Sequence, residues 1–191
     1  MAHLNAKRKN TKVNQLNAGM QRNKNIHVVN MNIFYLDRDP VVAASYVYDK
    51  HKVKMILESA QMLCTAHRYY GNEHVPYKTA HLNHPSSIWC RANSEQYYWL
   101  YEHMLALGDE YTRRYNREHL TILKCEVPLM TLPPLIPCNQ KFTEPPQCMP
   151  DEYKVKGDSV QAYWNYYIGD KWKVANKNEK IYESKANTTL N

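Results

Sequence analysis

The sequence has 191 residues, of which 43% are apolar, and this length and composition suit one domain with a sizeable core. The formal charge is +7, but six of the basic residues lie within residues 1–30, where there is no acid. The other 161 residues carry 19 basic and 18 acidic side chains, so the charge predicts a disordered basic arm at 1–30 followed by a nearly neutral body.

The apolar residues also exclude two classes of protein. No run of about eighteen apolar residues occurs, which argues against a membrane-spanning helix, and the first residues lack the apolar core of a secretory signal. The five cysteines are an odd number without a CxxC spacing, which favours reduced thiols over a disulfide framework or a zinc knuckle. We therefore expect a protein of the cytoplasm, the host cytoplasm if phage-encoded, with no cofactor and no metal.

The first elements after the arm are a short apolar run and a helix. Residues 32–36 read as a strand or a buried extended segment. Asp39 followed by Pro40 predicts a helix start, since the acid can cap the helix and proline fits its first turn. From Val53 the apolar positions recur at i, i+3, i+4 and i+7, which predicts a helix that ends before Gly71.

The middle of the chain is predicted to contain the longest helix. Residues 71–87 read as a loop, and either Asn93 or Ser94 is placed to open a helix whose apolar face runs to Tyr115. Residues 117–126 are predicted to form a further short helix.

The last third begins with seven prolines between residues 127 and 150, which exclude regular structure there. Asp158 is predicted to cap a final helix at 159–175, and residues 176–191 read as a flexible tail. The sum is a mainly α protein: a single compact helical domain at 31–175 with a long Pro-rich loop and a disordered basic N-terminal arm.

The polar face of the helix after Val53 is narrow. Five polar side chains share a stripe about 80° wide when the helix is drawn at about 100° per residue: His51, Lys54, Glu58, Gln61 and Thr65. Apolar side chains come close to its edges, whereas a solvated surface helix usually has a wider polar arc. The stripe is therefore interpreted as facing a cleft, with an ordinary solvated face as the alternative.

Lys54 and Glu58, one turn apart, would give such a cleft a specific chemistry. Lys50 and Lys52 crowd Lys54 with positive charge, which favours its neutral form as a nucleophilic amine. Glu58 would stabilise an oxocarbenium ion or move protons, with His51 beside it. The alternative is a stabilising i,i+4 salt bridge without catalytic role.

Two motifs carry a resemblance to a known family. The segments "MNIFYLD" (31–37) and "DKHKVKMILE" (49–58) resemble the start of the phage pyrimidine-dimer DNA glycosylases of the endonuclease V type, with Asp49, His51 and Glu58 at the matching positions. "YWNYYIGDK" (163–171) resembles the aromatic stretch near that family's C-terminus. The middle of the chain is similar to a group of tailed-phage proteins with the same layout.

The resemblance implies a mainly helical DNA repair enzyme that removes a damaged pyrimidine and nicks the strand, with Glu58 as the catalytic carboxylate. In that family the nucleophile is the amine of the processed N-terminus, but the corresponding start here, Met31-Asn32, follows thirty other residues. Four alternatives stay open: that translation begins at Met31, that the arm is removed, that Lys54 supplies the amine, or that the lyase chemistry is absent.

Residues 81–91, "HLNHPSSIWCR", are a candidate DNA contact. His84 and Arg91 are expected to meet phosphates or the cleft, and Trp89 to stack on a base. The alternative is that Trp89 lies in the core and Arg91 pairs with an acid. A metal site at His81 and His84 is disfavoured because no third ligand stands at a short, fixed spacing.

Two further groups are candidate DNA contacts. Arg113, Arg114 and Arg117 suit a phosphate backbone, although cations at a helix end also complement the helix dipole. In residues 162–173 we expect Trp164, Tyr166 and Lys171 to form a stacking platform or wedge, with Tyr163, Tyr167 and one Trp in the core as the alternative.

These interpretations combine into one expected function. The protein is expected to bind damaged or modified duplex DNA and to act as a DNA glycosylase and AP lyase, with Glu58, Lys54 and His51 as catalytic residues. The alternative is a non-catalytic phage nucleic-acid-binding or virion-associated protein on the same scaffold. A hydrolase or transferase acting on a modified nucleotide is a third possibility.

Overall fold

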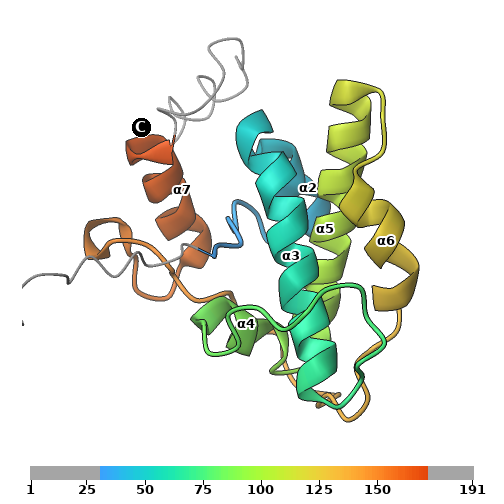
Figure 1. Cartoon of the computed structure of the whole chain (residues 1–191). Coiled ribbons are helices and arrows are strands. Elements are labelled where there is room, and N and C mark those ends of the chain that lie inside the picture. The colour runs from blue at the N-terminus through green and yellow to red at the C-terminus, as the bar shows by residue number, and fades with distance from the viewer. Residues whose placement is uncertain (1–30, 172–191) are drawn as a thin grey trace, which may run out of the picture. The chain divides into compact units, whose positions relative to one another are not determined.

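The computed structural model describes residues 31–171, which belong to a unit that begins at Met31. Within these residues the chain forms six α-helices and one short 3₁₀ helix, and no β-strand (Figure 1). The predicted mainly α fold is therefore confirmed. The predicted arm at 1–30, the tail at 176–191 and the last four residues of the predicted domain lie outside the described residues.

The α-helices are α2 (Pro40–Tyr46), α3 (Asp49–Tyr69), α4 (Pro85–Cys90), α5 (Ser94–Tyr115), α6 (Leu120–Leu129) and α7 (Ser159–Gly169), and the 3₁₀ helix is η1 (Asp151–Tyr153). None of these helices combines the length and the apolar character that crossing a lipid bilayer requires.

Three helices begin at capping side chains that the sequence predicts. Asp39 accepts hydrogen bonds from the first turn of α2, Asn93 from Gln96 in α5, and Asp158 from Gln161 in α7. These caps satisfy main-chain N–H groups that have no partner inside the helix. The cap of α3 is different, because Tyr48 makes no side-chain capping bond, and α3 begins four residues before Val53.

The helices α3 and α5 lie side by side and form the centre of the domain (Figure 1). The helix α2 packs against α5, while α4 and α6 each contact both central helices. Gly108 on α5 allows the close approach of α6, because a Cβ atom there would lie 2.7 Å from Cγ1 of Ile122. Apolar side chains such as Ile56 and Leu107 are fully buried between these layers.

Residues 31–36 form a buried irregular segment rather than a strand or a fully extended chain, because Phe34 has a left-handed backbone with φ of 52°. This lead-in segment contacts both α3 and α7. Phe34 contacts Tyr167 of α7, with ring centroids 4.9 Å apart. Trp164, also on α7, donates a hydrogen bond from its indole nitrogen to the carbonyl oxygen of Leu36 at 2.8 Å. This lead-in segment therefore runs between the central helix and the last one.

The Pro-rich segment after α6 is irregular, as predicted, except that residues 127–129 belong to α6. Its course is fixed by hydrogen bonds from the domain to its carbonyl groups. Trp89 donates to Thr143 at 2.7 Å, and Tyr163 donates to Pro146 at 2.8 Å. These bonds hold residues 130–150 against the domain, and we call this segment the strap.

Candidate active site

Glu58 lies in the middle of α3 and is only 7% exposed, although it is charged. Its Oε2 atom accepts a hydrogen bond from the main-chain nitrogen of Asn32 at 3.2 Å, and its Oε1 atom lies 3.1 Å from Nζ of Lys54. The Lys54 side chain is 63% exposed. The carboxylate is thus sheltered, and an amine reaches it from the solvent side.

Asn32 is held in place by its own side chain. Its Oδ1 atom accepts the N–H of Ile33 at 2.9 Å, and its Nδ2 atom donates to the carbonyl oxygen of Cys148 in the strap at 3.1 Å. The residue is 2% exposed. These bonds fix the main chain of the lead-in segment so that its N–H points at Glu58.

His51 lies two turns before Glu58, on the same stripe of α3. Its ring stacks on Phe34, with centroids 5.1 Å apart and planes 7° apart, and its Nδ1 atom lies 2.9 Å from the hydroxyl of Tyr167. That hydroxyl accepts the N–H of Tyr48 at 3.0 Å and has its own hydrogen to donate to Nδ1. In the tautomer in which it does so, the ring proton of neutral His51 is on Nε2.

The pKa of His51 is lowered to about 4. Burial is the largest cause, and the positive charges of Lys171 and Lys54 add to it. At neutral pH the imidazole is therefore uncharged, and its Nε2 atom is a hydrogen-bond donor in the tautomer that accepts from Tyr167.

Thr65 lies on the same stripe, about two turns after Glu58, and positions the loop that follows α3. Its hydroxyl accepts the N–H of Ala80 at 3.0 Å and donates to the carbonyl oxygen of the same residue at 3.2 Å. The next residue, His81, has a left-handed backbone with φ of 49°. The charge on His81 acts on Glu58, which places this loop beside the carboxylate.

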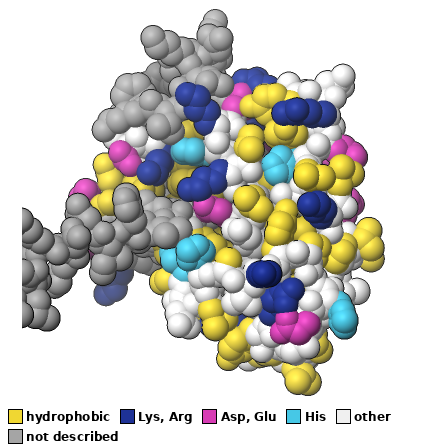
Figure 2. All heavy atoms as spheres, in the orientation of Figure 1, with side chains coloured by type: hydrophobic (Ala, Val, Ile, Leu, Met, Phe, Trp, Pro, Cys, Tyr) yellow, Lys and Arg dark blue, Asp and Glu magenta, His cyan; other side chains and the backbone are white. Residues whose placement is uncertain are grey.

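Burial raises the pKa of Glu58 above its ordinary value. The hydrogen bond and charge of Lys54, the N–H of Asn32 and the charge of His81 act in the opposite direction but do not cancel the effect. A carboxyl group with a raised pKa exchanges protons closer to neutral pH, as a general acid or base must. Figure 2 shows Lys or Arg and His side chains close to an acidic side chain beside α3.

We call Asn32, His51, Lys54, Glu58 and His81 the Glu58 site. It contains the three residues predicted as catalytic, together with two that were not in the predicted set. His81 belongs to the His pair singled out in the sequence. The hydrogen bond from Asn32 is made by its main chain, and the only signal for it was the place of this residue in the "MNIFYLD" motif.

Arg113 and Arg114, predicted to bind DNA, belong to a network of ion pairs between the start of α3 and the end of α5. Arg114 pairs with Asp49, and Arg113 pairs with Glu110 at 2.5 Å. Lys52 lies between the acids, 3.5 Å from Asp49 and 3.2 Å from Glu110. We call these five residues the Asp49 network. Asp49 precedes Glu58 by nine residues, about 13 Å along the helix axis, so Arg114 pairs with an acid outside the Glu58 site, and its expected phosphate contact stays a prediction.

Arg91 and Trp89 are both buried. Arg91 is 9% exposed, donates to the carbonyl oxygen of Leu82 at 2.7 Å and lies 4.6 Å above the ring of Tyr69. Trp89 is 6% exposed and donates its indole hydrogen to the strap. For Trp89 this geometry favours the core alternative over base stacking, and Arg91 takes a carbonyl group and a ring as partners.

His84 caps α4, since its Nδ1 atom accepts the N–H of Ser86 at 3.2 Å. Burial and the charge of His81 lower the pKa of His84. Its ring is half-buried, so one edge remains available to a ligand. The expected phosphate contact of His84 stays a prediction.

Arg117 and the aromatic residues of α7 have mixed positions. Arg117 is exposed and donates from Nε to the hydroxyl of Tyr111 at 2.9 Å. Tyr166 is 3% exposed, and Nζ of Lys171 lies 4.6 Å from the centre of its ring. Trp164 is half-buried. Of the two rings expected in the stacking platform, Tyr166 is therefore buried and Trp164 is partly exposed. The positive charge of Lys171 lowers the pKa of His51.

Between Met31 and Lys171, no three His, Cys, Asp or Glu side chains lie close enough together to hold a metal ion. The five cysteines are unbridged, and three of them are buried.

Comparison of the chain with protein-family models, with curated proteins and with solved structures gives no match. What the protein does is therefore inferred below from the geometry of the Glu58 site and from the motifs in its sequence.

Proposed function

We propose that the protein is a DNA N-glycosylase with AP lyase activity, acting on a duplex that carries a damaged or modified pyrimidine. The observation that supports it is the environment of Glu58. A sheltered carboxylate is contacted by two nitrogen atoms, at 3.1 and 3.2 Å, and one of them belongs to an accessible amine. Amine and carboxylate together are the groups needed to break a glycosidic bond and then a phosphate ester bond.

The reaction begins when the amine nitrogen forms a bond to C1′ of the deoxyribose. The glycosidic bond breaks, and its electron pair leaves with the base, which takes up a proton. The negative charge of Glu58 offsets the positive charge that develops on the sugar in this step. The attached nitrogen then releases a proton to Glu58.

The second half of the reaction opens the sugar and cuts the strand. The nitrogen lone pair forms a double bond to C1′ while the ring oxygen leaves this carbon and takes the proton back from Glu58. The product is a protonated Schiff base. A base removes a proton from C2′, and the 3′ phosphate departs with the electron pair of its bond to C3′. The raised pKa of Glu58 suits both proton transfers.

Lys54 is the first candidate for the amine. Its Nζ atom is 3.1 Å from Glu58, and its exposure allows a sugar to approach. The neighbouring carboxylate can accept the proton that an ammonium group must lose before it attacks and pass it to solvent, so that Glu58 is charged again when C1′ is attacked.

The main-chain nitrogen of Asn32 is the second candidate. It is an amide in the chain described here, and it becomes a nucleophilic amine only in a chain that begins at this residue. Its position, 3.2 Å from Oε2 of Glu58, matches the amine-to-carboxylate arrangement that the resemblance implies. Both candidates therefore use the same carboxylate.

One experiment tests the proposal and identifies the amine. The full chain is incubated with a duplex containing a single cyclobutane pyrimidine dimer, with and without borohydride, which reduces a Schiff base to a stable adduct. A chain that begins at Asn32 is tested beside the full chain. We expect a nick and a trapped protein–DNA adduct, at Lys54 in either chain or at the amine of Asn32 only in the shorter one, as peptide mapping will identify. Lys54→Met tests the first candidate against Lys50→Met, an exposed lysine on the same helix. Absence of both nick and adduct would contradict the proposal.

A non-catalytic DNA-binding protein is the second candidate function. It is favoured by the amide state of the Asn32 nitrogen and by the i,i+4 spacing of Lys54 and Glu58, which is common in structural salt bridges. In this case DNA affinity falls steeply with salt, because binding releases counterions from the phosphates. A filter-binding titration should then give the same affinity and salt dependence for the wild type and for Glu58→Gln.

A further inference from the structure

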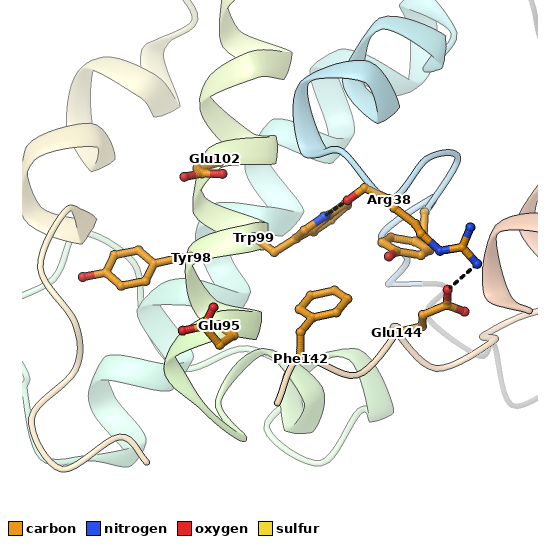
Figure 3. Close-up of a pocket in the computed structure, with 8 residues that line it drawn as sticks. Arg38, Glu95, Tyr98, Trp99, Glu102, Phe142 and Glu144 are labelled. Carbon is orange, nitrogen blue, oxygen red and sulfur yellow. Dashed lines mark hydrogen bonds and ion pairs between the residues drawn. The ribbon is translucent and has the colours of Figure 1, made fainter. Parts of the chain in front are cut away.

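A second site lies on α5, away from the residues of the Glu58 site. It is a surface pocket of about 370 Å³ between α5, the lead-in segment and the strap. Figure 3 shows its residues, which come from these three parts of the chain. None of the residues that line it belongs to the Glu58 site. Its role is therefore a separate question from the chemistry of Glu58.

Aromatic rings form the walls of this pocket: Tyr35, Tyr98, Trp99 and Phe142. The Trp99 ring is 4.9 Å from Tyr35, and its indole nitrogen donates to the carbonyl oxygen of Arg38 at 2.7 Å, which fixes its orientation. In Figure 3 the Phe142 ring extends from the strap toward Trp99. The pocket thus offers ring surfaces whose position is set by the fold.

The charges that line the pocket are mainly negative. Glu95, Glu102 and Glu144 are opposed by Arg38 alone, so this pocket is acidic although the whole chain is basic. Arg38 pairs with Glu144 at 3.2 Å. Neither Glu95 nor Glu102 has an ion pair with another residue between Met31 and Lys171. These two carboxylates stand seven residues apart on α5, about 10 Å along the helix axis.

This combination of groups selects a class of ligand. Aromatic faces attract cations, and an acidic lining repels anions. Both carboxylates are exposed, and a cationic ligand gains an attraction to them that a neutral ligand lacks. Two carboxylates about 10 Å apart, with ring surfaces between and beside them, match a chain of methylene groups with an amine toward each end.

We propose that this pocket binds a linear aliphatic polyamine, with its ammonium groups at Glu95 and Glu102 and its methylene groups against Trp99 and Phe142. Glu144 keeps Arg38 as its partner and closes the far end of the pocket. Binding at this position does not depend on the proposed activity at Glu58.

The proposal is tested by calorimetric titration of the full chain with spermidine at physiological salt. The double variant Glu95→Gln/Glu102→Gln removes both ammonium partners, and we expect its affinity to fall by about tenfold or more. The matched control is Glu118→Gln/Glu126→Gln, which removes the same charge from two exposed residues outside the pocket and should leave the affinity unchanged. A linear diol of the same length as spermidine should not bind.

Three results would overturn the assignment. The first is an absence of spermidine binding to the wild-type chain. The second is an equal loss of affinity in the two double variants, which would mean that spermidine acts only as a counterion. The third is tighter binding of a lysine-containing peptide with the same dependence on Glu95 and Glu102, which would assign the pocket to a protein side chain.

Discussion

Lys52 and Lys54 stand two residues apart on α3, and each pairs with a carboxylate, yet their surroundings differ. Lys52 has a side chain that is 7% exposed, and it lies between two acids that have arginine partners of their own. Lys54 is 63% exposed and has one acid, Glu58, whose other oxygen is held by a main-chain N–H.

The difference indicates a structural role for Lys52 and supports the chemical role proposed for Lys54 and Glu58. In the Asp49 network each acid is contacted by two cations, so the charges hold α3 to α5 and leave little for a ligand. At Glu58 the single cation reaches in from the solvent and can be displaced. A lysine paired with an acid is therefore expected to stabilise the fold at the start of α3, and to be reactive at Glu58, more than two turns later.

The largest expected effect is that of Glu58→Gln on activity. Removing the carboxylate should lower cleavage of the dimer-containing duplex by about 10²–10⁴-fold, the usual contribution of an acid–base group. Folding should be preserved, because burial already disfavours the charged form of Glu58. Glu110→Gln, in the Asp49 network, is the control and should keep the activity. Equal activity of Glu58→Gln and the wild type would contradict the catalytic role.

The next effect is on stability and concerns Lys52. Lys52→Met leaves Asp49 and Glu110 with fewer cations at a buried position, so the free energy of unfolding should fall by about 3 kcal/mol. Urea unfolding followed by circular dichroism measures this change. A loss as small as that of an exposed salt bridge would show that the Asp49 network does not stabilise the domain.

The third prediction is a pH dependence that arises at His51. Its pKa is about 4 in the folded protein and about 6.5 in the unfolded chain, so only the unfolded state takes up a proton between these values. The stability that neutral His51 contributes is complete above the unfolded pKa and is lost as the pH falls toward 4. Unfolding measured from pH 7 to pH 4 should show a weaker pH dependence in His51→Gln than in the wild type.

The smallest expected effect is that of Lys54→Met on stability. Because the side chain is mostly exposed, the loss of its salt bridge should change the free energy of unfolding by less than about 1 kcal/mol. The same variant removes the candidate amine, so it should form less borohydride-trapped adduct than Lys50→Met. A large loss of stability in Lys54→Met would show that Lys54, like Lys52, has a structural role.

The sequence predicted the helices well where a capping side chain or a regular apolar spacing marks them. Asp39, Asn93 and Asp158 are such caps. No capping residue marked the start of α3, because Tyr48 makes no side-chain capping bond, although the polar stripe already placed His51 on this helix. Residues 32–36 were ambiguous because a short apolar run fits a strand and an extended segment equally well.

The candidate site was only partly predictable. Helical spacing alone placed His51 and Glu58 on one stripe. It did not reveal Tyr167, which was assigned to the core although its hydroxyl contacts His51 across 116 residues of chain. Arg113 and Arg114 were expected to contact phosphates, and their spacing did not show that they pair with Glu110 and Asp49. Their partners come from packing between two helices.

The hydrogen bond from the main chain of residue 32 to Glu58 makes the carboxylate tolerant of sequence drift. Every amino acid except proline has a main-chain N–H, so substitutions that preserve the path of the chain keep this bond. Asn32→Pro is the one change that deletes it directly. The side chain of Asn32 therefore acts on the carboxylate only indirectly, by holding the path of the chain, and a comparison of side chains at Glu58 alone would overlook this bond.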